Sequence, residues 1–305
     1  MKEVVLAMDL GGTNTRFGAV RWNGEIIARH RIPTPKTTSG SEFINALAAG
    51  YYATAQMASA RVEAIAAAIP ATVGAKTKRL SKLPNLPVLE GVDLKSELSK
   101  RLNAEVVLEN DATAATIGEH WLGVSQGKDS VIGVTLGTGI GGGIFINGLP
   151  YRGKDGSAGE IGHICVEPKG YVCGCGSRGC VEQYSSGTAI VRAAHSMGLN
   201  VESSTDVFEL AIKGSQNAVK VFSEAGRYLG IVLAGLINTF NPDMIVIGGG
   251  VAAGWEMFIG SLRNEVQQRA YSEPAERANI VRAELGDDAG VLGAAKVAFD
   301  NVMPF

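Results

Sequence analysis

The same order of short strands and glycine-rich turns occurs twice in this sequence. In the first copy, VVLAMDL runs through Gly11-Gly12 into TRFGAVRW, and an Asn23-Gly24 turn leads on to EIIARHRIP. In the second copy, SVIGVTL runs into the glycines of residues 137–143, then IFI, then an Asn147-Gly148 turn. The apolar and β-branched runs predict strands, and Asn-Gly readily takes the positive φ values of a two-residue turn. We therefore expect a duplicated unit that begins with three antiparallel strands.

The segments that follow extend both copies in a similar way. In the first copy we predict a helix over 41–60, the strand EAIAAAIP, a helix over 93–102 and the strand EVVLEN. In the second copy, helices near 187–197, 204–213 and 216–239 precede the strand DMIVIGGG, a helix over 254–270, the strand ANIVRAE and a final helix. Two copies of a β-β-β-α-β-α unit predict an α/β protein with two lobes around a cleft, into which both glycine turns face.

The boundary between the lobes is expected near residue 112. A chain of 305 residues is too long for one compact core and fits two domains. No linker rich in Pro or Ser separates the lobes, so the boundary should be a helical crossover. We expect a small N-terminal lobe over residues 1–112, joined by the C-terminal helix of residues 290–305, and a large lobe over residues 113–289.

The charge and hydropathy of the chain exclude several classes of partner. The net charge is only −2 and Lys and Arg are scattered, so neither nucleic acid nor an anionic membrane is expected as a partner. The longest strongly apolar run, residues 228–237, is about half of the ~20 residues that a bilayer span requires. Glu3 and Asp9 interrupt the stretch in which a signal peptide would need apolar residues. We expect a cytoplasmic protein that acts on a small molecule.

Four metal-binding side chains fall within one glycine-rich loop, residues 163–180: His163, Cys173, Cys175 and Cys180. Four N and S donors at short spacing suit a closed tetrahedral Zn²⁺ site, which would stabilise a loop too short to form its own core. A reducing compartment also favours metal binding over disulfides. The remaining cysteine, Cys165, would compete with His163 as a ligand, and we expect it to be a small buried residue instead.

The glycine turns have the composition of phosphate-binding loops. The segment of residues 137–142 satisfies G-x-G-x-x-G, but a strand follows it, whereas the dinucleotide fingerprint requires a helix. No Gly-Lys-Ser/Thr closes any glycine run, which excludes a Walker loop. Exposed N–H groups beside glycines can bind phosphate oxygens, here with help from the Thr138 hydroxyl. The alternative is a tight hairpin without a ligand.

Two carboxylates stand at the ends of predicted strands. Asp9 precedes the first glycine turn, where it could hold Mg²⁺ through water, or it could be a buried structural residue. Asp111 is expected at the N-cap of the helix that begins with ATAATIGEHWLG, and capping alone would explain it. A carboxylate beside a cleft is also well placed to act as general base for a substrate hydroxyl. Carboxylates, amides and one imidazole that suit the hydroxyls of a polyol recur at Asn85, Asn110, Asp111, Glu160, His163 and Glu182.

These motifs together resemble the ROK sugar-kinase family, whose members share the duplicated actin-like, ribonuclease-H-like ATPase fold. The resemblance covers nearly the whole chain and rests on DLGGTNTRFGAV, LPNLP, ENDATAA, TLGTGIGGGI, AGEIGH, CGCGSRGCVE and SSG. It implies a homodimeric, ATP-dependent hexose kinase that uses Mg²⁺ and carries a structural Zn²⁺ bound by His163 and the three loop cysteines. Asp111 would be the base, and Asn85, Asn110, Asp111, Glu160, His163 and Glu182 would hold the sugar. The nucleotide would be bound by Asp9, Gly11, Gly12, Thr13, Asn14, Gly137, Thr138, Gly139 and Gly249.

Glucose, phosphorylated at its 6-hydroxyl, is the first expectation for the substrate, because ENDA, AGEIGH and PNLP resemble bacterial glucokinases most. Glu160 argues against kinases specific for N-acetylmannosamine, which can carry His at that position. One departure is Pro70-Ala71, where glucokinases commonly have Pro-Gly and the allose kinase subgroup is more similar. Allose, fructose, mannose and N-acetylmannosamine therefore remain alternatives.

Two other classes of protein also remain possible. The first is the sugar-responsive repressor of the same family, which places a helix-turn-helix module before the kinase-like body. Only eight residues precede Asp9, and the charge does not suit DNA binding, so we expect no such module. The second is a zinc-stabilised sugar-binding regulator without catalysis, which the loss of Asp111 would have favoured.

Overall fold

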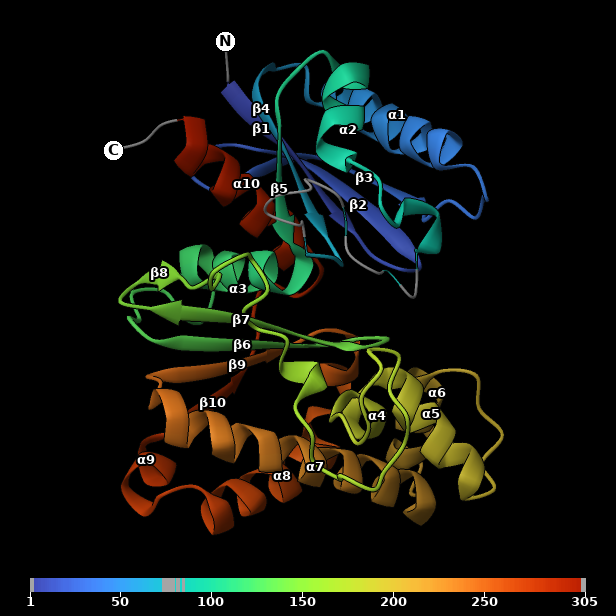
Figure 1. Cartoon of the computed structure of the whole chain (residues 1–305), viewed down its shortest axis with the longest axis vertical. Coiled ribbons are helices and arrows are strands. Elements are labelled where there is room, and N and C mark those ends of the chain that lie inside the picture. The colour runs from blue at the N-terminus through green and yellow to red at the C-terminus, as the bar shows by residue number, and fades with distance from the viewer. Residues whose placement is uncertain (1–2, 73–79, 81–82, 84–85, 303–305) are drawn as a thin grey trace. The chain divides into compact units, whose positions relative to one another are not determined.

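A computed structural model of the chain describes residues 3–72, 80, 83 and 86–302 (Figure 1). The chain divides into two compact units, residues 1–127, 150–158 and 287–305 in the first and residues 128–149 and 159–286 in the second. Each unit is built on one five-stranded mixed sheet with helices. The predicted α/β class with a duplicated sheet is confirmed. No helix in the described part of the chain is both long enough and apolar enough to span a bilayer.

The first sheet has the strand order β3-β2-β1-β4-β5. Its strands are β1 (Glu3–Leu10), β2 (Asn14–Val20), β3 (Ile26–Pro33), β4 (Arg61–Ile69) and β5 (Val106–Asn110). The first three strands are antiparallel, as predicted, whereas β1, β4 and β5 run parallel. Asp9 pairs with Ala68, and Ala68 pairs with Glu109, so the three parallel strands end at the same edge of the sheet.

Helices cover the two faces of the first sheet. They are α1 (Gly40–Ala58), α2 (Leu94–Leu102), α3 (Asp111–Leu122) and α10 (Ala289–Val302), with a short 3₁₀ helix η1 (Pro87–Leu89). Residues 4, 6, 8 and 10 of β1 share one apolar core with α1 and α2, because alternate residues of a strand point to the same face. The opposite face of β1 and β4 packs against α10 (Figure 1).

The second sheet repeats the topology of the first in the order β10-β9-β6-β7-β8. Its strands are β6 (Val131–Leu136), β7 (Ile140–Ile146), β8 (Leu149–Pro150), β9 (Met244–Gly248) and β10 (Asn279–Arg282). The strand β6 is antiparallel to β7 and parallel to β9, which is parallel to β10. The first, fourth and fifth strands of each copy are therefore parallel neighbours. This agreement supports the duplication inferred from the sequence.

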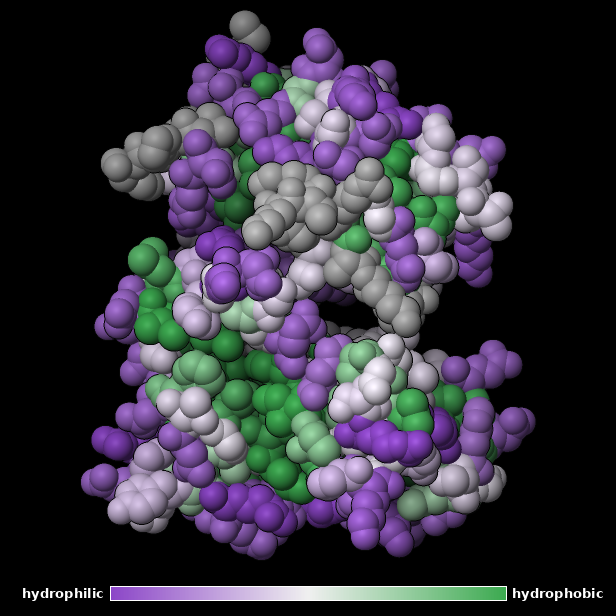
Figure 2. Space-filling model, in the orientation of Figure 1, coloured by the Kyte–Doolittle hydropathy of each residue, from purple (hydrophilic) through white to green (hydrophobic). Residues whose placement is uncertain are grey.

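The helices of the second unit pack around one apolar core that includes β6 and β9. The helices are α4 (Glu182–Ser185), α5 (Gly187–Ser196), α6 (Ser204–Ile212), α7 (Gln216–Phe240), α8 (Trp255–Arg269) and α9 (Ser272–Arg277), with the 3₁₀ helices η2 (Ile161–His163) and η3 (Gly250–Gly254). A further 3₁₀ helix, η4 (Gly286–Asp288), lies at the boundary between the units. Figure 2 shows apolar residues exposed over part of this unit, on the face where α7 and α8 lie in Figure 1. The predicted long helices are present, whereas α4, α9 and β8 were not anticipated.

The helix α3 belongs to the first unit, although the boundary expected near residue 112 would assign it to the large lobe. The contact with α10, a helix of the first unit, explains this position. The two helices pack very closely because glycines lie at their interface. A Cβ added at Gly118 would lie 2.4 Å from the Ala289 carbonyl oxygen, and one added at Gly293 would lie 1.6 Å from that of Ala114. Neither position can accept a side chain without separating the helices.

Replacing Gly293 with Ala should therefore lower the free energy of unfolding by at least about 2 kcal/mol, because the methyl group would overlap backbone of α3. The matched control is Gly260→Ala on the exposed side of α8, where an added Cβ meets nothing within 4 Å. That substitution should raise the stability by about 0.5–1 kcal/mol, because alanine favours the helix. Denaturant titration of both variants gives the comparison, and equal stability of the two would contradict the packing described here.

Candidate functional site

Most of the predicted ligand-binding residues of the first unit lie at the edge where its parallel strands end. Asp9 and the glycine turn come at the end of β1, Ala71 follows β4, and Asp111 follows β5. Adjacent strands are about 4.8 Å apart, so the row from Asp9 to Glu109 spans about 10 Å. The carboxyl ends of parallel strands are the usual ligand edge of open α/β sheets. The register therefore brings a base candidate and a phosphate-binding candidate to one edge.

The first glycine turn, residues 11–14, is held by backbone contacts. The N–H of Gly11 donates to the Asn14 carbonyl at 3.1 Å, and a Cβ at Gly11 would lie 2.8 Å from that oxygen. The Thr34 hydroxyl donates to the Gly11 carbonyl at 2.6 Å. The Asn14 side chain accepts from Arg31 at 3.1 Å, while Gly12 and Thr13 are exposed. These hydrogen bonds hold the turn in one conformation, in which Gly12 and Thr13 are exposed.

Asp9 is largely but not fully buried, and Arg16 is the cation beside it. Burial, opposed by Arg16 and reinforced by Asp287, raises the pKa of Asp9 from 3.8 to about 6. The Arg16 guanidinium lies 3.7 Å from Asp9 but only 2.8 Å from Asp287, so it neutralises Asp9 incompletely. A Cβ at Gly290 would lie 2.7 Å from the Asp9 carboxyl carbon. A partly exposed carboxylate with such a weak partner fits the binding of a hydrated cation.

The prediction that Asp111 is the N-cap of α3 is wrong. Asn110 is the cap, and its side-chain oxygen accepts from the N–H of Thr113 at 3.0 Å. Asp111 is the first helical residue, and it is half-buried, with one carboxylate oxygen accepting from the N–H of Ala112 at 2.8 Å. Because Asn110 caps the helix, capping does not account for Asp111. The side chain therefore stays a candidate for the general base.

Two arginines in the first unit were missed by the sequence analysis. Arg16 could have been found, because it is paired directly across the strands from Asp9. Arg152 forms an ion pair at 2.6 Å with Glu109, the residue before Asn110. The two residues are 43 positions apart in sequence. No local sequence pattern predicts the contact between Arg152 and Glu109.

The second glycine turn, Gly137–Ile140, connects β6 to β7 at the corresponding edge of the second sheet. The Gly137 N–H donates to the Gly139 carbonyl at 2.9 Å, which closes the turn. The N–H groups of Thr138 and Gly139 donate to no acceptor within the described part of the chain, and Thr138 is exposed. Two adjacent N–H groups without an acceptor suit an anion such as a phosphate.

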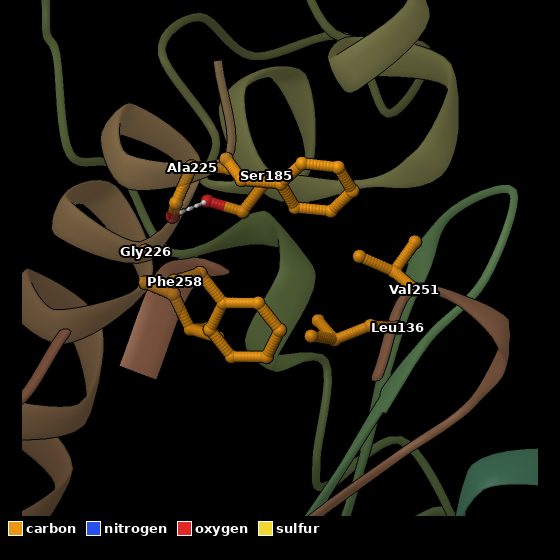
Figure 3. A pocket seen from close by; sticks show the side chains of 8 residues that line it. Leu136, Ser185, Ala225, Gly226, Val251 and Phe258 are labelled. Carbon is orange, nitrogen blue, oxygen red and sulfur yellow. Dashed lines mark hydrogen bonds between the residues drawn. The ribbon is translucent and has the colours of Figure 1, made fainter. Parts of the chain in front are cut away.

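Gly249 follows β9 at the same edge and has a packing reason to be glycine. Its φ is 87°, and an added Cβ would lie 2.4 Å from the Leu136 carbonyl oxygen. A small apolar pocket of about 10 Å³ lies between Leu136, Val251, Phe222 and Phe258 (Figure 3). It has room for about one water molecule and is too small for a nucleobase. This pocket is therefore not the nucleotide site.

The four predicted metal ligands of the zinc loop come together in the second unit. The donor atoms of His163, Cys173, Cys175 and Cys180 all lie within 4.8 Å of one another. The sulfurs of Cys175 and Cys180 are 3.7 Å apart, and His163 Nδ1 is 3.6 Å from the Cys173 sulfur. Tetrahedral Zn²⁺ with Zn–S bonds of about 2.3 Å would place two sulfurs about 3.8 Å apart. The cluster fits this metal, and its sulfur spacing is too long for a disulfide.

The cysteines differ in their surroundings. Burial, together with the neighbouring thiols of Cys175 and Cys173, raises the pKa of Cys180 to about 12. A divalent cation would relieve this crowding, because metal ligation requires thiolates and favours their formation. Cys165 is exposed, which corrects the expectation that it is buried. Its backbone pairs with that of Cys180, so the strand-like pairing explains its position in the loop.

His163 and Glu182 connect the zinc loop to other polar groups. His163 directs Nδ1 toward Cys173, while its Nε2 lies 3.8 Å from Glu160. A small closing of this distance would let the second nitrogen of His163 donate to the carboxylate, the usual partner of a metal-binding histidine. Glu182, the first residue of α4, accepts from the N–H of Ile140 at 3.0 Å. Its other oxygen lies 3.9 Å from the Cys173 sulfur.

The predicted residues thus form two groups, one in each unit. Asp9, the first glycine turn, Asn110 and Asp111 lie at the edge of the first sheet, and Asn85 lies outside the described residues. Glu160, His163, Glu182, the second glycine turn and the zinc cluster lie in the second unit. The individual ligand-binding and catalytic roles remain predictions.

The chain is similar to proteins of known type over almost its whole length. The ROK family model matches residues 5–301. The glucokinase of Thermotoga maritima is 32% identical over 312 residues, which cover 98% of this chain and 98% of the relative. The xylose repressor of Bacillus subtilis is 34% identical over 212 residues, which cover 70% of this chain and 55% of the repressor.

A solved structure agrees with the sequence comparisons. The ROK family glucokinase of Streptomyces griseus, in complex with glucose and AMPPNP, has a TM-score of 0.85 and 34% sequence identity, and the match covers 97% of this chain and 99% of that chain. The duplicated actin-like fold is therefore shared, and the cysteine and histidine cluster fits the zinc motif of such proteins. By its sequence and its fold, the chain belongs to the ROK family.

Proposed function

We propose that this protein is an ATP-dependent hexose kinase that phosphorylates the 6-hydroxyl of glucose. The observation that carries the proposal is the register of the first sheet, which brings Asp111 and the Asp9 glycine turn to one ligand edge. Similarity to a glucokinase that was solved with glucose and AMPPNP supports both substrates. The acidic and imidazole groups around the zinc loop add hydrogen-bonding partners suited to sugar hydroxyls.

In this proposal Asp111 accepts the proton of the sugar hydroxyl as that oxygen attacks the γ-phosphorus of ATP. Asn110 fixes the start of α3 and so holds the Asp111 backbone in place. Asn85, Asn110, Glu160, His163 and Glu182 bind the remaining hydroxyls. Phosphoryl transfer has a loose transition state, so alignment and charge stabilisation provide most of the rate enhancement. The N–H groups of the two glycine turns would offset charge on the phosphates.

Two metals complete the proposal. Asp9 would hold Mg²⁺ through water, and the ion would neutralise phosphate charge when it is bound. Zn²⁺, bound by His163, Cys173, Cys175 and Cys180, would have a structural role, because four protein ligands leave no open coordination position. It would hold Glu160 and Glu182 on the two sides of the loop.

Allose is the main alternative substrate, because Ala71 occupies a position where glucokinases commonly have glycine. The Ala71 side chain is buried in the core of the first unit, and its N–H donates to the Ile69 carbonyl at 2.8 Å. An assay of Mg²⁺-dependent ADP release with glucose, allose, mannose, fructose and N-acetylmannosamine distinguishes the sugars, and NMR gives the product position. We expect glucose to have the highest kcat/KM and to be phosphorylated at O6.

A sugar-binding regulator without catalysis is the second candidate, because the Bacillus subtilis xylose repressor shares 34% identity over 70% of this chain. The same assay separates the two functions. A regulator would bind a hexose in a direct titration and would release no ADP with any sugar. Turnover with any hexose in the panel would reject the regulator.

Asp111→Asn should abolish turnover while leaving sugar binding within a few-fold of the wild type, because asparagine keeps the shape of the side chain but cannot accept the proton. We expect kcat to fall by about 10² to 10⁴-fold. Asp93→Asn is the matched control, since Asp93 is a carboxylate at the start of α2 that accepts from the Ser96 N–H. Steady-state kinetics and calorimetric sugar titration provide the two readouts. Substantial phosphorylation by Asp111→Asn would exclude its role as base.

Cys175→Ser should lose zinc and weaken sugar binding together, because the loop that carries Glu160 and Glu182 would lose its stabilising cation. Cys165→Ser is the control, since Cys165 is exposed and lies outside the ligand cluster. It should keep one zinc per chain and an unchanged KM. Elemental analysis and sugar kinetics measure both properties. A zinc-free Cys175→Ser protein with normal KM would remove the structural role assigned to the metal.

Asp9→Asn should stabilise the ligand-free protein at neutral pH while it weakens Mg²⁺-ATP binding. Folded Asp9 has a pKa of about 6 against 3.8 in the unfolded chain, so between these values only the folded state keeps its proton. The contribution of Asp9 to stability therefore falls as the pH rises from about 4 to about 6, by up to about 3 kcal/mol. Asparagine removes this loss.

Denaturant titrations of Asp9→Asn and the wild type between pH 4 and pH 7.5 measure the effect. The stability advantage of the variant should be largest at pH 7.5 and should shrink toward pH 4. A purely structural Asp9 would give the opposite result, with the variant less stable at neutral pH and the affinity for Mg²⁺-ATP unchanged.

A further inference from the structure

Three hydrogen bonds join the second glycine turn to the segment that directly follows the zinc loop. The N–H of Gly187 donates to the Gly137 carbonyl at 2.8 Å, and the Thr188 hydroxyl donates to the Thr138 carbonyl at 2.9 Å. The Ile140 N–H donates to the Glu182 carboxylate at 3.0 Å. Of the three attachments, the one made by Glu182 is the only one that involves a charged side chain. It is also the one nearest to the zinc cluster in sequence.

The carboxylate of Glu182 and the shape of the turn depend on each other. One oxygen binds the Ile140 N–H, and the other lies 3.9 Å from the sulfur of Cys173. A Cβ at Gly139 would lie 2.4 Å from the oxygen that binds Ile140. Gly139 does not have a positive φ, so the close approach of Glu182 is the reason for glycine at this position. A methyl group at Gly139 would displace the Glu182 carboxylate from its place beside the turn.

We propose that Glu182 is a positioning residue for the second glycine turn, through which the zinc loop sets the affinity for the phosphates of the nucleotide. The inference rests on the proposed function, in which the turn binds phosphates and Glu182 binds the sugar. The inference adds that nucleotide binding at the turn and sugar binding at Glu182 are coupled. A sugar that binds one oxygen of Glu182 acts on the turn through the other, and by thermodynamic linkage the nucleotide affects sugar affinity by the same factor.

The first test measures Mg²⁺-AMPPNP binding in the absence of sugar by calorimetry. Glu182→Ala removes the acceptor of the Ile140 N–H, and its Kd should rise about 10- to 150-fold, the effect of one lost hydrogen bond to a charged group. Glu182→Gln keeps an oxygen of the same reach, so its nucleotide Kd should stay within about threefold of the wild type, even though the loss of charge weakens sugar binding. Wild-type nucleotide affinity in Glu182→Ala would overturn the proposal.

The second test reverses the direction and measures glucose binding in the absence of nucleotide. Gly139→Ala places a methyl group against Glu182, so its glucose Kd should rise about 5-fold or more. Gly260→Ala is the control in the same unit, because its added Cβ on the exposed side of α8 meets nothing within 4 Å, and its glucose Kd should not change. Equal glucose affinity in the two variants would also overturn the proposal.

Zinc content and thermal unfolding identify the variants that have folded. If Glu182→Ala does not fold, the glucose titration of Gly139→Ala still tests the proposal. The wild type separates the inference from the proposed function. A wild type that binds no Mg²⁺-AMPPNP rejects the kinase and the inference together. A wild type that binds it, alongside a Glu182→Ala protein of equal affinity, rejects the inference and leaves the kinase intact.

Discussion

The parallel pairing of three strands in each sheet is the constraint on which the candidate site depends. Parallel strands end at the same edge, so Asp9 on β1 and Asp111 just after β5, about 100 positions apart in sequence, come to one edge of the sheet with β4 between their strands. The same pairing in the second sheet brings the turn at Gly137 together with the glycines after β9. A slip of one residue would turn each side chain to the opposite face. In β1 such a slip would remove the large side chains of Leu6, Met8 and Leu10 from the core that they share with α1 and α2.

The duplication explains why so much of the fold could be predicted. The two glycine turns and the Asn-Gly turns are strong local signals, and the repeated order of elements leads directly to two sheets of the same topology. The boundary near residue 112 is a different case, because the position of α3 is decided by its contact with α10, far away in the sequence. The N-cap of α3 shows the limit of local signals, since Asn110 and Asp111 are both good caps and only the backbone geometry selects Asn110.

The candidate site also has features that the sequence predicts and contacts that it does not. The zinc cluster was predictable because its ligands are close in sequence and their residue types are specific for soft metals. The contacts of Arg152 with Glu109 and of Glu182 with Ile140 were not predictable, since each joins segments about 40 residues apart through one pair of residues. The exposed position of Cys165 shows that even within a well-recognised loop, residue type alone does not decide burial.

The packing of α10 on the first unit also has a consequence for the synthesis of the protein. The helix that covers one face of β1 and β4 comes from residues 289–302, whereas the strands are made first. Residues 128–286 contain nearly all of the second unit and need no later segment for their sheet. During translation the second unit can therefore close its core while the first still exposes one apolar face. The helix α3, which carries Asp111, reaches its final packing only after residues 289–302 have left the ribosome, so this later segment completes the first unit.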